Sequence, residues 1–153
     1  TALNTRRQNV EFAEEMREAD LKPELEIFNN GHVGEMQYLI DEGVLEKPYW
    51  ASLVLGMQTG VPPNPRELLN LVQSLPEDTE WQCIATGKHQ LPLTTMAMIL
   101  GGHVRVGLED NVYYRSGRLA ESNSQLVERT VRIADELERK VATPDEAREM
   151  LGL

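Results

Sequence analysis

Charged side chains interrupt an apolar segment at residues 101–111, GGHVRVGLEDN. In an extended strand Arg105 and Glu109 would share one face, because successive strand side chains point to opposite sides. Burying two charges on one face is costly unless they pair with each other or perform a task. The spacing therefore leaves two interpretations open: a structural arginine–glutamate pair, or a catalytic strand end that Asp110 extends.

Apolar periodicity and turn residues predict strand–helix units along the chain. The expected strands are Glu24–Phe28, Tyr49–Gly56, Trp81–Gly87 and His103–Glu109. The expected helices are Thr5–Ala19, Gly34–Glu42, Pro65–Leu75, Leu91–Leu100 and Ser122–Arg139, with a short final helix after residue 143. Asn64 and Thr143 are the expected side-chain caps of two of these helices. The alternation implies βαβ units built around a parallel sheet.

The composition limits the partners that the chain can have. It has 153 residues, 41% of them hydrophobic, and a formal net charge of −10. This length allows one domain with a substantial core. An acidic surface argues against nucleic acid and anionic membranes as partners, and no apolar run approaches a membrane-spanning length. The single cysteine, Cys83, suits a reducing cytoplasm and is expected to be a small buried hydrophobe rather than a nucleophile.

Four strand–helix units are compatible with two folds. They could form half of a (β/α)₈ barrel, which typically needs ~250 residues, or a complete four-stranded doubly wound domain. In a barrel, Glu24 and Glu26 would point inward together with Arg105 and Glu109. The catalytic mouth of such barrels lies at the carboxyl ends of the strands. Carboxylates placed there could ligate zinc or act as general bases.

Longer motifs carry a resemblance to a known family. They are KPELEIF at 22–28, GHV at 31–33, LGGH at 100–103, VRVGLEDN at 104–111, NSQLV at 123–127 and ATPDEAR at 142–148. With these motifs the chain resembles the β-keto acid cleavage enzymes, a family that includes the 3-keto-5-aminohexanoate cleavage enzyme. The resemblance runs from about Leu21 to Leu153 and covers only the C-terminal half of the family's chain.

The resemblance implies an α/β fold in which residues 1–153 form the C-terminal half of a single TIM-barrel domain. This half comprises strands five to eight of a (β/α)₈ barrel with their helices, and the N-terminal half is absent. The implied reaction is zinc-dependent cleavage of a β-keto acid with acetyl-CoA, which gives acetoacetate and an acyl-CoA by retro-Claisen acyl transfer. Zn²⁺ would be the cofactor and coenzyme A the co-substrate, in a cytoplasmic homo-oligomer of the kind that serves lysine fermentation.

The resemblance also assigns roles to individual residues. Glu109 matches the family's zinc-binding glutamate, and Arg105 and Asp110 match its catalytic arginine and aspartate. A glutamate of the strand at 24–28 is expected to act as well. Glu26 is preferred to Glu24 because it lies nearer the carboxyl end of that strand.

The family's zinc-binding His-x-His motif does not occur in this sequence. Because one glutamate is not a zinc site, the histidine ligands are expected in the missing half, and this chain alone is expected to be inactive. His32 and His89 follow strands and could reach the catalytic mouth, although local bonding is the simpler expectation. Lys88 and the glycines near it could meet the phosphates of coenzyme A, or could serve turn formation alone.

Two other functions stay open at this point. One is a metal-independent α/β enzyme that uses Arg105, Glu109 and Asp110. The other is a non-catalytic half-barrel that dimerises or binds a partner. A half-barrel favours association because its two edge strands are unpaired and inward side chains such as Val54 lack cover. The metal content of a polypeptide that also includes upstream residues would separate these two functions from zinc-dependent cleavage of a β-keto acid.

Overall fold

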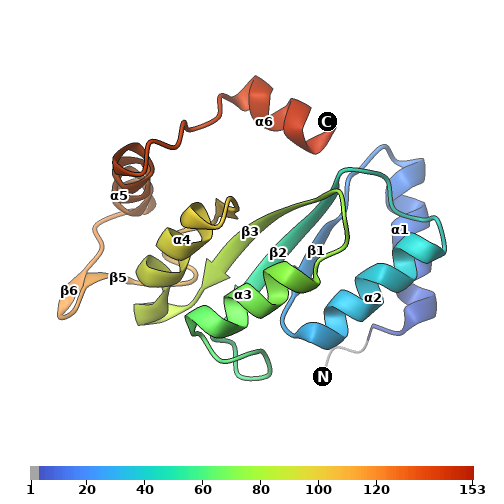
Figure 1. Cartoon of the computed structure of the whole chain (residues 1–153), viewed down its shortest axis with the longest axis horizontal. Coiled ribbons are helices and arrows are strands. Elements are labelled where there is room, and N and C mark those ends of the chain that lie inside the picture. Colours follow the sequence, from blue (N-terminus) through green and yellow to red (C-terminus); the bar gives the residue numbers. More distant parts are fainter. Residues whose placement is uncertain (1–3) are drawn as a thin grey trace.

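The computed structural model describes residues 4–153 of the chain. Its main sheet consists of the parallel strands β1 (Glu24–Ile27), β2 (Tyr49–Leu55), β3 (Thr79–Ala85) and β4 (His103–Val104). Each strand pairs with the one that follows it in the sequence, so the order is β1-β2-β3-β4. Figure 1 shows β1, β2 and β3 in this order. The predicted α/β class with a parallel sheet is confirmed. A doubly wound sheet would reverse its strand order at a switch point, and this sheet does not.

Helices connect the strands. The helices around the main sheet are α1 (Arg6–Glu18), α2 (Asn30–Asp41), α3 (Pro65–Ser74) and α4 (Gln90–Ile99), with a 3₁₀ turn, η1 (Gly87–His89), before α4. The elements after β4 are a hairpin of β5 (Tyr113–Arg115) and β6 (Arg118–Leu119), then α5 (Asn123–Glu136) and α6 (Pro144–Leu151). Both predicted caps are confirmed. The Asn64 side chain accepts a hydrogen bond from the Glu67 backbone N–H, and Thr143 forms a capping box with Glu146.

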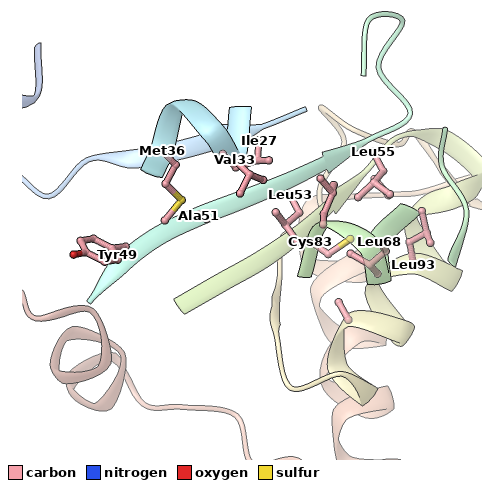
Figure 2. Close-up of a cluster of buried hydrophobic side chains, with 13 residues drawn as sticks. Ile27, Val33, Met36, Tyr49, Ala51, Leu53, Leu55, Leu68, Cys83 and Leu93 are labelled. Carbon is pink, nitrogen blue, oxygen red and sulfur yellow. The ribbon is translucent and has the colours of Figure 1, made fainter. Parts of the chain in front are cut away.

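One side of the sheet packs against the helices and forms the main core (Figure 2). Its largest fully buried side chains include Met36, Leu53, Leu55, Leu68 and Leu93. Cys83 is buried among them, as predicted. Burial raises the pKa of the Cys83 thiol to about 12, so the thiol stays protonated near neutral pH and cannot serve as a nucleophile there.

The other side of the sheet is mainly polar. Its side chains include Glu24, Glu26, Ser52, Gln82 and His103. Two apolar residues on this side, Val54 and Ile84, are register partners on neighbouring strands and have exposed fractions of only 5% and 0%. Paired side chains on adjacent strands cover each other, so the expected exposure of Val54 is wrong.

The fourth strand is much shorter than predicted. β4 includes only His103 and Val104, although the Arg105 N–H still donates to the Cys83 carbonyl at 3.1 Å. The chain then bends, and the Asn111 N–H donates to the Gly107 carbonyl at 3.1 Å. The alternation that placed Arg105 and Glu109 on one strand face therefore does not hold, because Glu109 lies in a turn rather than in a strand.

The two C-terminal helices, α5 and α6, contact different parts of the molecule. α5 packs against α4, and Arg139 from the end of α5 donates to the carbonyls of Met98 and Gly102 at 2.6 and 2.9 Å. An extended segment then leads to α6, visible at the top of Figure 1. Gly152 shares a pocket with Lys22 and Lys47, so α6 ends near the amino ends of β1 and β2. Within residues 4–153, no helix combines the length and apolar character that crossing a membrane requires.

Candidate active site at the carboxyl end of the sheet

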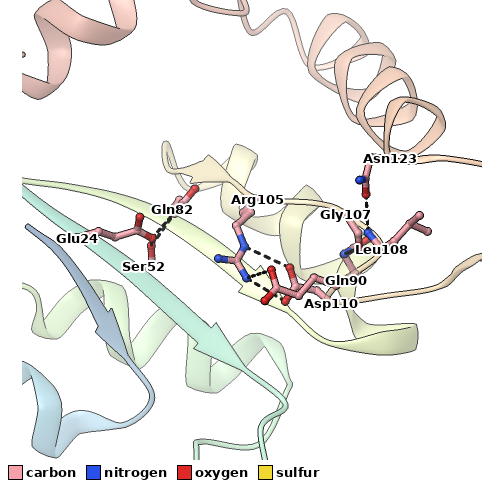
Figure 3. Close-up of polar contacts among 10 residues, drawn as sticks. Glu24, Ser52, Gln82, Gln90, Arg105, Gly107, Leu108, Asp110 and Asn123 are labelled. Atoms are coloured by element: carbon pink, nitrogen blue, oxygen red, sulfur yellow. Dashed lines mark hydrogen bonds and ion pairs between the residues drawn. The ribbon is translucent and has the colours of Figure 1, made fainter. Parts of the chain in front are cut away.

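The turn after β4 folds back onto Arg105. Arg105 Nε donates to Asp110 Oδ2 at 3.3 Å, and its Nη2 donates to Asp110 Oδ1 at 3.2 Å (Figure 3). The same Nη2 also reaches Glu109 Oε2 at 3.3 Å. The hydrogen bond to Asp110 is the largest cause of the raised pKa of Arg105. The structure therefore brings together the three residues that the sequence motif predicted, although by a turn and not by strand alternation.

The two carboxylates of this cluster differ in environment. The Asp110 side chain is only 10% exposed, whereas that of Glu109 is 83% exposed. Asp110 is therefore the fixed counter-charge that orients the guanidinium by two hydrogen bonds. Glu109 is held on one oxygen only and is open to a further partner. The cluster thus combines a buried carboxylate, Asp110, that is paired with Arg105, and an accessible carboxylate, Glu109, that a ligand can reach.

The turn is held by residues to which the sequence motifs assigned no role. Asn123 at the start of α5 accepts a hydrogen bond from the Leu108 N–H at 2.7 Å. The buried Gln90 side chain donates to the Gly107 carbonyl at 3.4 Å, and Asn111 donates to Gln90 at the same distance. An amide residue at the start of a mostly apolar helix was the available signal for Gln90, since buried amides need partners.

The β1 glutamates have different partners. Glu24 accepts hydrogen bonds from Ser52 and, at 3.1 Å, from Gln82 Nε2, which also donates to Ser52 Oγ at 2.8 Å (Figure 3). Glu26 lies near enough to Arg105 for its charge to contribute to the raised pKa of Arg105. Ser52 and Gln82 were not predicted, because only the register of neighbouring strands brings them to Glu24.

Two histidine side chains, those of His32 and His103, have partners within the chain. His32 Nδ1 accepts from the Phe28 N–H at 3.3 Å, and the two rings meet edge to face. His103 Nε2 lies 3.3 Å from Glu80 Oε2. Among residues 4–153, no group of three or more His, Cys, Asp or Glu side chains is arranged to hold a metal ion. The described part of the chain can thus supply one carboxylate, Glu109, to a metal but not a complete ligand set.

Comparisons with known proteins place the chain in a family. The 3-keto-5-aminohexanoate cleavage enzyme of Fusobacterium nucleatum subsp. nucleatum is 42% identical over 151 residues, which are 99% of this chain and 55% of that protein. The 3-dehydrocarnitine:acetyl-CoA trimethylamine transferase of Rhizobium meliloti is 33% identical over 150 residues, 98% of this chain and 50% of that protein. The chain thus spans about half the length of the curated relatives it matches.

The fold is also shared with a solved structure. Apo ObcA superposes with a TM-score of 0.81 at 18% sequence identity, over 98% of this chain and 40% of ObcA. A family model described as beta-keto acid cleavage enzyme matches residues 1–153. Since that match spans the whole chain, the chain belongs to the beta-keto acid cleavage enzyme family.

Proposed function

We propose that this chain is part of an enzyme that cleaves a β-keto acid with acetyl-CoA. In this reaction R–CO–CH₂–COO⁻ and acetyl-CoA give acetoacetate and R–CO–CoA, so one acyl group replaces another on the thiol. The observation that carries the proposal is the cluster of Arg105, Glu109 and Asp110 at the carboxyl end of a parallel sheet in a member of this family. The name of the Rhizobium meliloti relative, an acetyl-CoA-dependent transferase, supports the choice of co-substrate.

We further propose that the chain forms strands five to eight of a (β/α)₈ barrel. Three features support this assignment: the singly wound strand order, the polar face opposite the helices, and a length of about half the relatives. Among the described residues β1 pairs only with β2, and β4 only with β3, so each has an edge that another strand could join. An N-terminal half would pair with both edges and close the ring.

The unpaired edges also predict association. The 153-residue chain alone is expected to form a homo-oligomer or to aggregate, because exposed strand edges template pairing. Sedimentation at micromolar concentration measures this. A monomer that unfolds in one sharp, cooperative transition would contradict the half-barrel assignment.

Arg105, Asp110 and Glu26 are the proposed catalytic residues. Asp110 is oriented by Arg105, and this pair would help to remove a proton from the substrate. Glu26 is preferred to Glu24 because Glu24 is already engaged with Ser52 and Gln82. Its charge lies close to that of Arg105, at the end of the sheet where the turn places Asp110.

Zinc is the proposed metal, and the residues present fit it in part. Glu109 has an exposed carboxylate with an oxygen not engaged by Arg105, as a ligand requires. A bound zinc ion would polarise the substrate carbonyl. The remaining ligands would come from the N-terminal half, since no group of three or more His, Cys, Asp or Glu side chains among residues 4–153 is arranged to hold a metal ion. The 153-residue chain by itself is accordingly expected to be inactive.

The test is an assay of acetoacetate formation from acetyl-CoA and a panel of β-keto acids that includes 3-keto-5-aminohexanoate and 3-dehydrocarnitine. Two proteins are compared: the 153-residue chain, and one polypeptide that joins it to its upstream coding sequence. Product from the longer polypeptide and none from the shorter one is expected. Lack of acyl-CoA product from every substrate with the longer, zinc-loaded polypeptide would refute the proposed reaction.

A further inference from the structure

A cavity of about 780 Å³ lies beside the candidate active site, between η1, the β5–β6 hairpin and α5. Its polar lining residues include Lys88, Asn111, Tyr114, Arg115 and Arg129, and none of the carboxylates among residues 4–153 lines it. The whole chain carries a net charge of −10. A concave site with three cations and no acid, on so acidic a chain, is therefore electrostatically suited to an anion.

Arginines converge on one tyrosine at this cavity. The guanidinium carbons of Arg129, Arg115 and Arg118 lie 4.6, 5.4 and 5.9 Å from the centre of the Tyr114 ring. Arg132 Nη2 donates to the Tyr114 hydroxyl at 3.2 Å. Arg118 pairs with Glu121, but within residues 4–153 the other three arginines form no ion pair. Like charges brought together without counter-charges repel each other unless an anion joins them.

Arg129 is the least satisfied member of this cluster. Its Nε is buried and has no hydrogen-bond partner among residues 4–153, although another of its nitrogens donates to the Tyr114 carbonyl. Burial, and the neighbouring Arg132 and Arg115, lower the pKa of Arg129. A buried donor without a partner commonly marks a place where a ligand or water completes the bonding.

The cavity and the active site share a wall. The Gly87 N–H donates to the Asp110 carbonyl at 2.7 Å, and both Gly87 and Asn111 line the cavity. Leu91, Pro92 and Tyr113 add apolar surface to the same lining. One ligand could thus place phosphates on the arginines, lay an aromatic base on Tyr113, and direct a flexible arm toward Asp110.

We infer that this cavity binds the phosphate-bearing nucleotide end of coenzyme A, an inference that rests on the proposed function. Arg115 and Arg129 bind the phosphate oxygens through their forked donors, and Lys88 adds a point charge at the rim. The thiol end then extends past Asn111 to the Arg105–Asp110 pair. The sequence motif identified Lys88 alone, because the arginines lie on a hairpin and a helix that meet only in the fold.

The test is calorimetric titration of the longer polypeptide, in which the strand edges are expected to be paired, with coenzyme A, dephospho-coenzyme A, adenosine 3′,5′-bisphosphate and inorganic phosphate. Coenzyme A is expected to bind more tightly than dephospho-coenzyme A, and adenosine 3′,5′-bisphosphate more tightly than inorganic phosphate. Arg115→Gln is expected to weaken coenzyme A binding at least about tenfold, because a charge-assisted hydrogen bond is lost. Arg7→Gln, an exposed arginine on α1, is the matched control and should leave binding unchanged.

Arg115 is exposed, so its substitution leaves the fold intact and the test interpretable, whereas Arg129→Gln could unfold the hairpin. Coenzyme A affinity that is equal in Arg115→Gln and Arg7→Gln overturns the inference. So does equal affinity for inorganic phosphate and coenzyme A, which would indicate a general anion site. A changed oligomeric state in Arg115→Gln with no change in ligand binding also overturns it and assigns the arginines to a protein interface.

The inference and the proposed function fail separately. If the longer polypeptide makes no acetoacetate while the chain still binds coenzyme A through Arg115, only the reaction is wrong. If the reaction occurs and Arg115→Gln leaves the KM for acetyl-CoA unchanged, only the binding site is wrong. A raised KM for acetyl-CoA with an unchanged KM for the β-keto acid supports both.

Discussion

Two neighbouring arginine regions differ in their counter-charges. Arg105 is neutralised within the chain, since Asp110 holds it by two hydrogen bonds and Glu109 lies beside it. Arg115 and Arg129 gather around Tyr114, and no carboxylate from the described part of the chain lines their cavity. The first region is organised before any ligand arrives, as a catalytic pair should be. The second lacks its counter-charge, as an anion-binding site does before it is filled.

The largest expected effect is the loss of zinc on removal of the accessible carboxylate. In the longer polypeptide, Glu109→Ala is expected to lower zinc affinity by more than about 100-fold, since losing only an outer-shell partner of a ligand costs up to about that much. Metal analysis after dialysis against a graded chelator measures the change. Arg115→Gln, in the second region, is the control, because Arg115 is exposed and lies outside the proposed ligand set. Equal zinc retention by Glu109→Ala and wild type would remove Glu109 from the ligand set.

A smaller effect, a loss of kcat/KM, is expected when residue 105 keeps its positive charge but loses the forked geometry of the guanidinium. Arg105→Lys in the longer polypeptide is expected to lower kcat/KM roughly 100-fold, because an ammonium cannot hold Asp110 by two parallel bonds. Zinc content and the circular dichroism spectrum should not change. Wild-type turnover in this variant would mean that the Arg105–Asp110 pair is structural and plays no part in catalysis.

Because Asp110 is buried and Glu109 is exposed, neutralising each carboxylate is expected to change the free energy of unfolding by a different amount. Asp110→Asn is expected to lower the free energy of unfolding by about 1–2 kcal/mol, a value reduced because Arg105 is itself 36% exposed. Glu109→Gln should change it by less than about 0.5 kcal/mol, since the Glu109 side chain is 83% exposed. Urea unfolding of both variants gives the comparison. Equal losses would show that Glu109 shares the structural role.

The smallest expected effect concerns an exposed pair far from both regions. The pKa of Glu146 is lowered to about 2, first by its hydrogen bond to Lys140 and then by those to Thr143. A lowered pKa means that the ionised form stabilises α6 fully above the ordinary value of 4.5 and loses that effect as pH falls toward about 2. The protection of the α6 amides against exchange, after division by the intrinsic exchange rate at each pH, is therefore expected to fall across this range, and much less so in Glu146→Gln.

Much of the local structure followed from the sequence. The Asn64 and Thr143 caps, the burial of Cys83 and the extents of β1 and β2 were predicted to within a residue or two. These features depend on side chains near each other in the chain and on simple apolar periodicity. The pairing of Arg105 with Asp110 was expected only from the family resemblance, because residues five apart in a strand point to opposite faces.

Only the tertiary structure decided how the functional side chains converge. β4 ends at Val104 because the following turn is held by Asn123 and Gln90, which lie far from it in the sequence. Glu24 meets Ser52 and Gln82 through the register of three strands, and Arg115 meets Arg129 only where the hairpin packs on α5. The sequence by itself determined the first three strands, the main helices and the charged motif, but neither the short β4 nor the β5–β6 hairpin. Packing between distant elements determined which carboxylate is buried, which is accessible, and which arginines lack a partner.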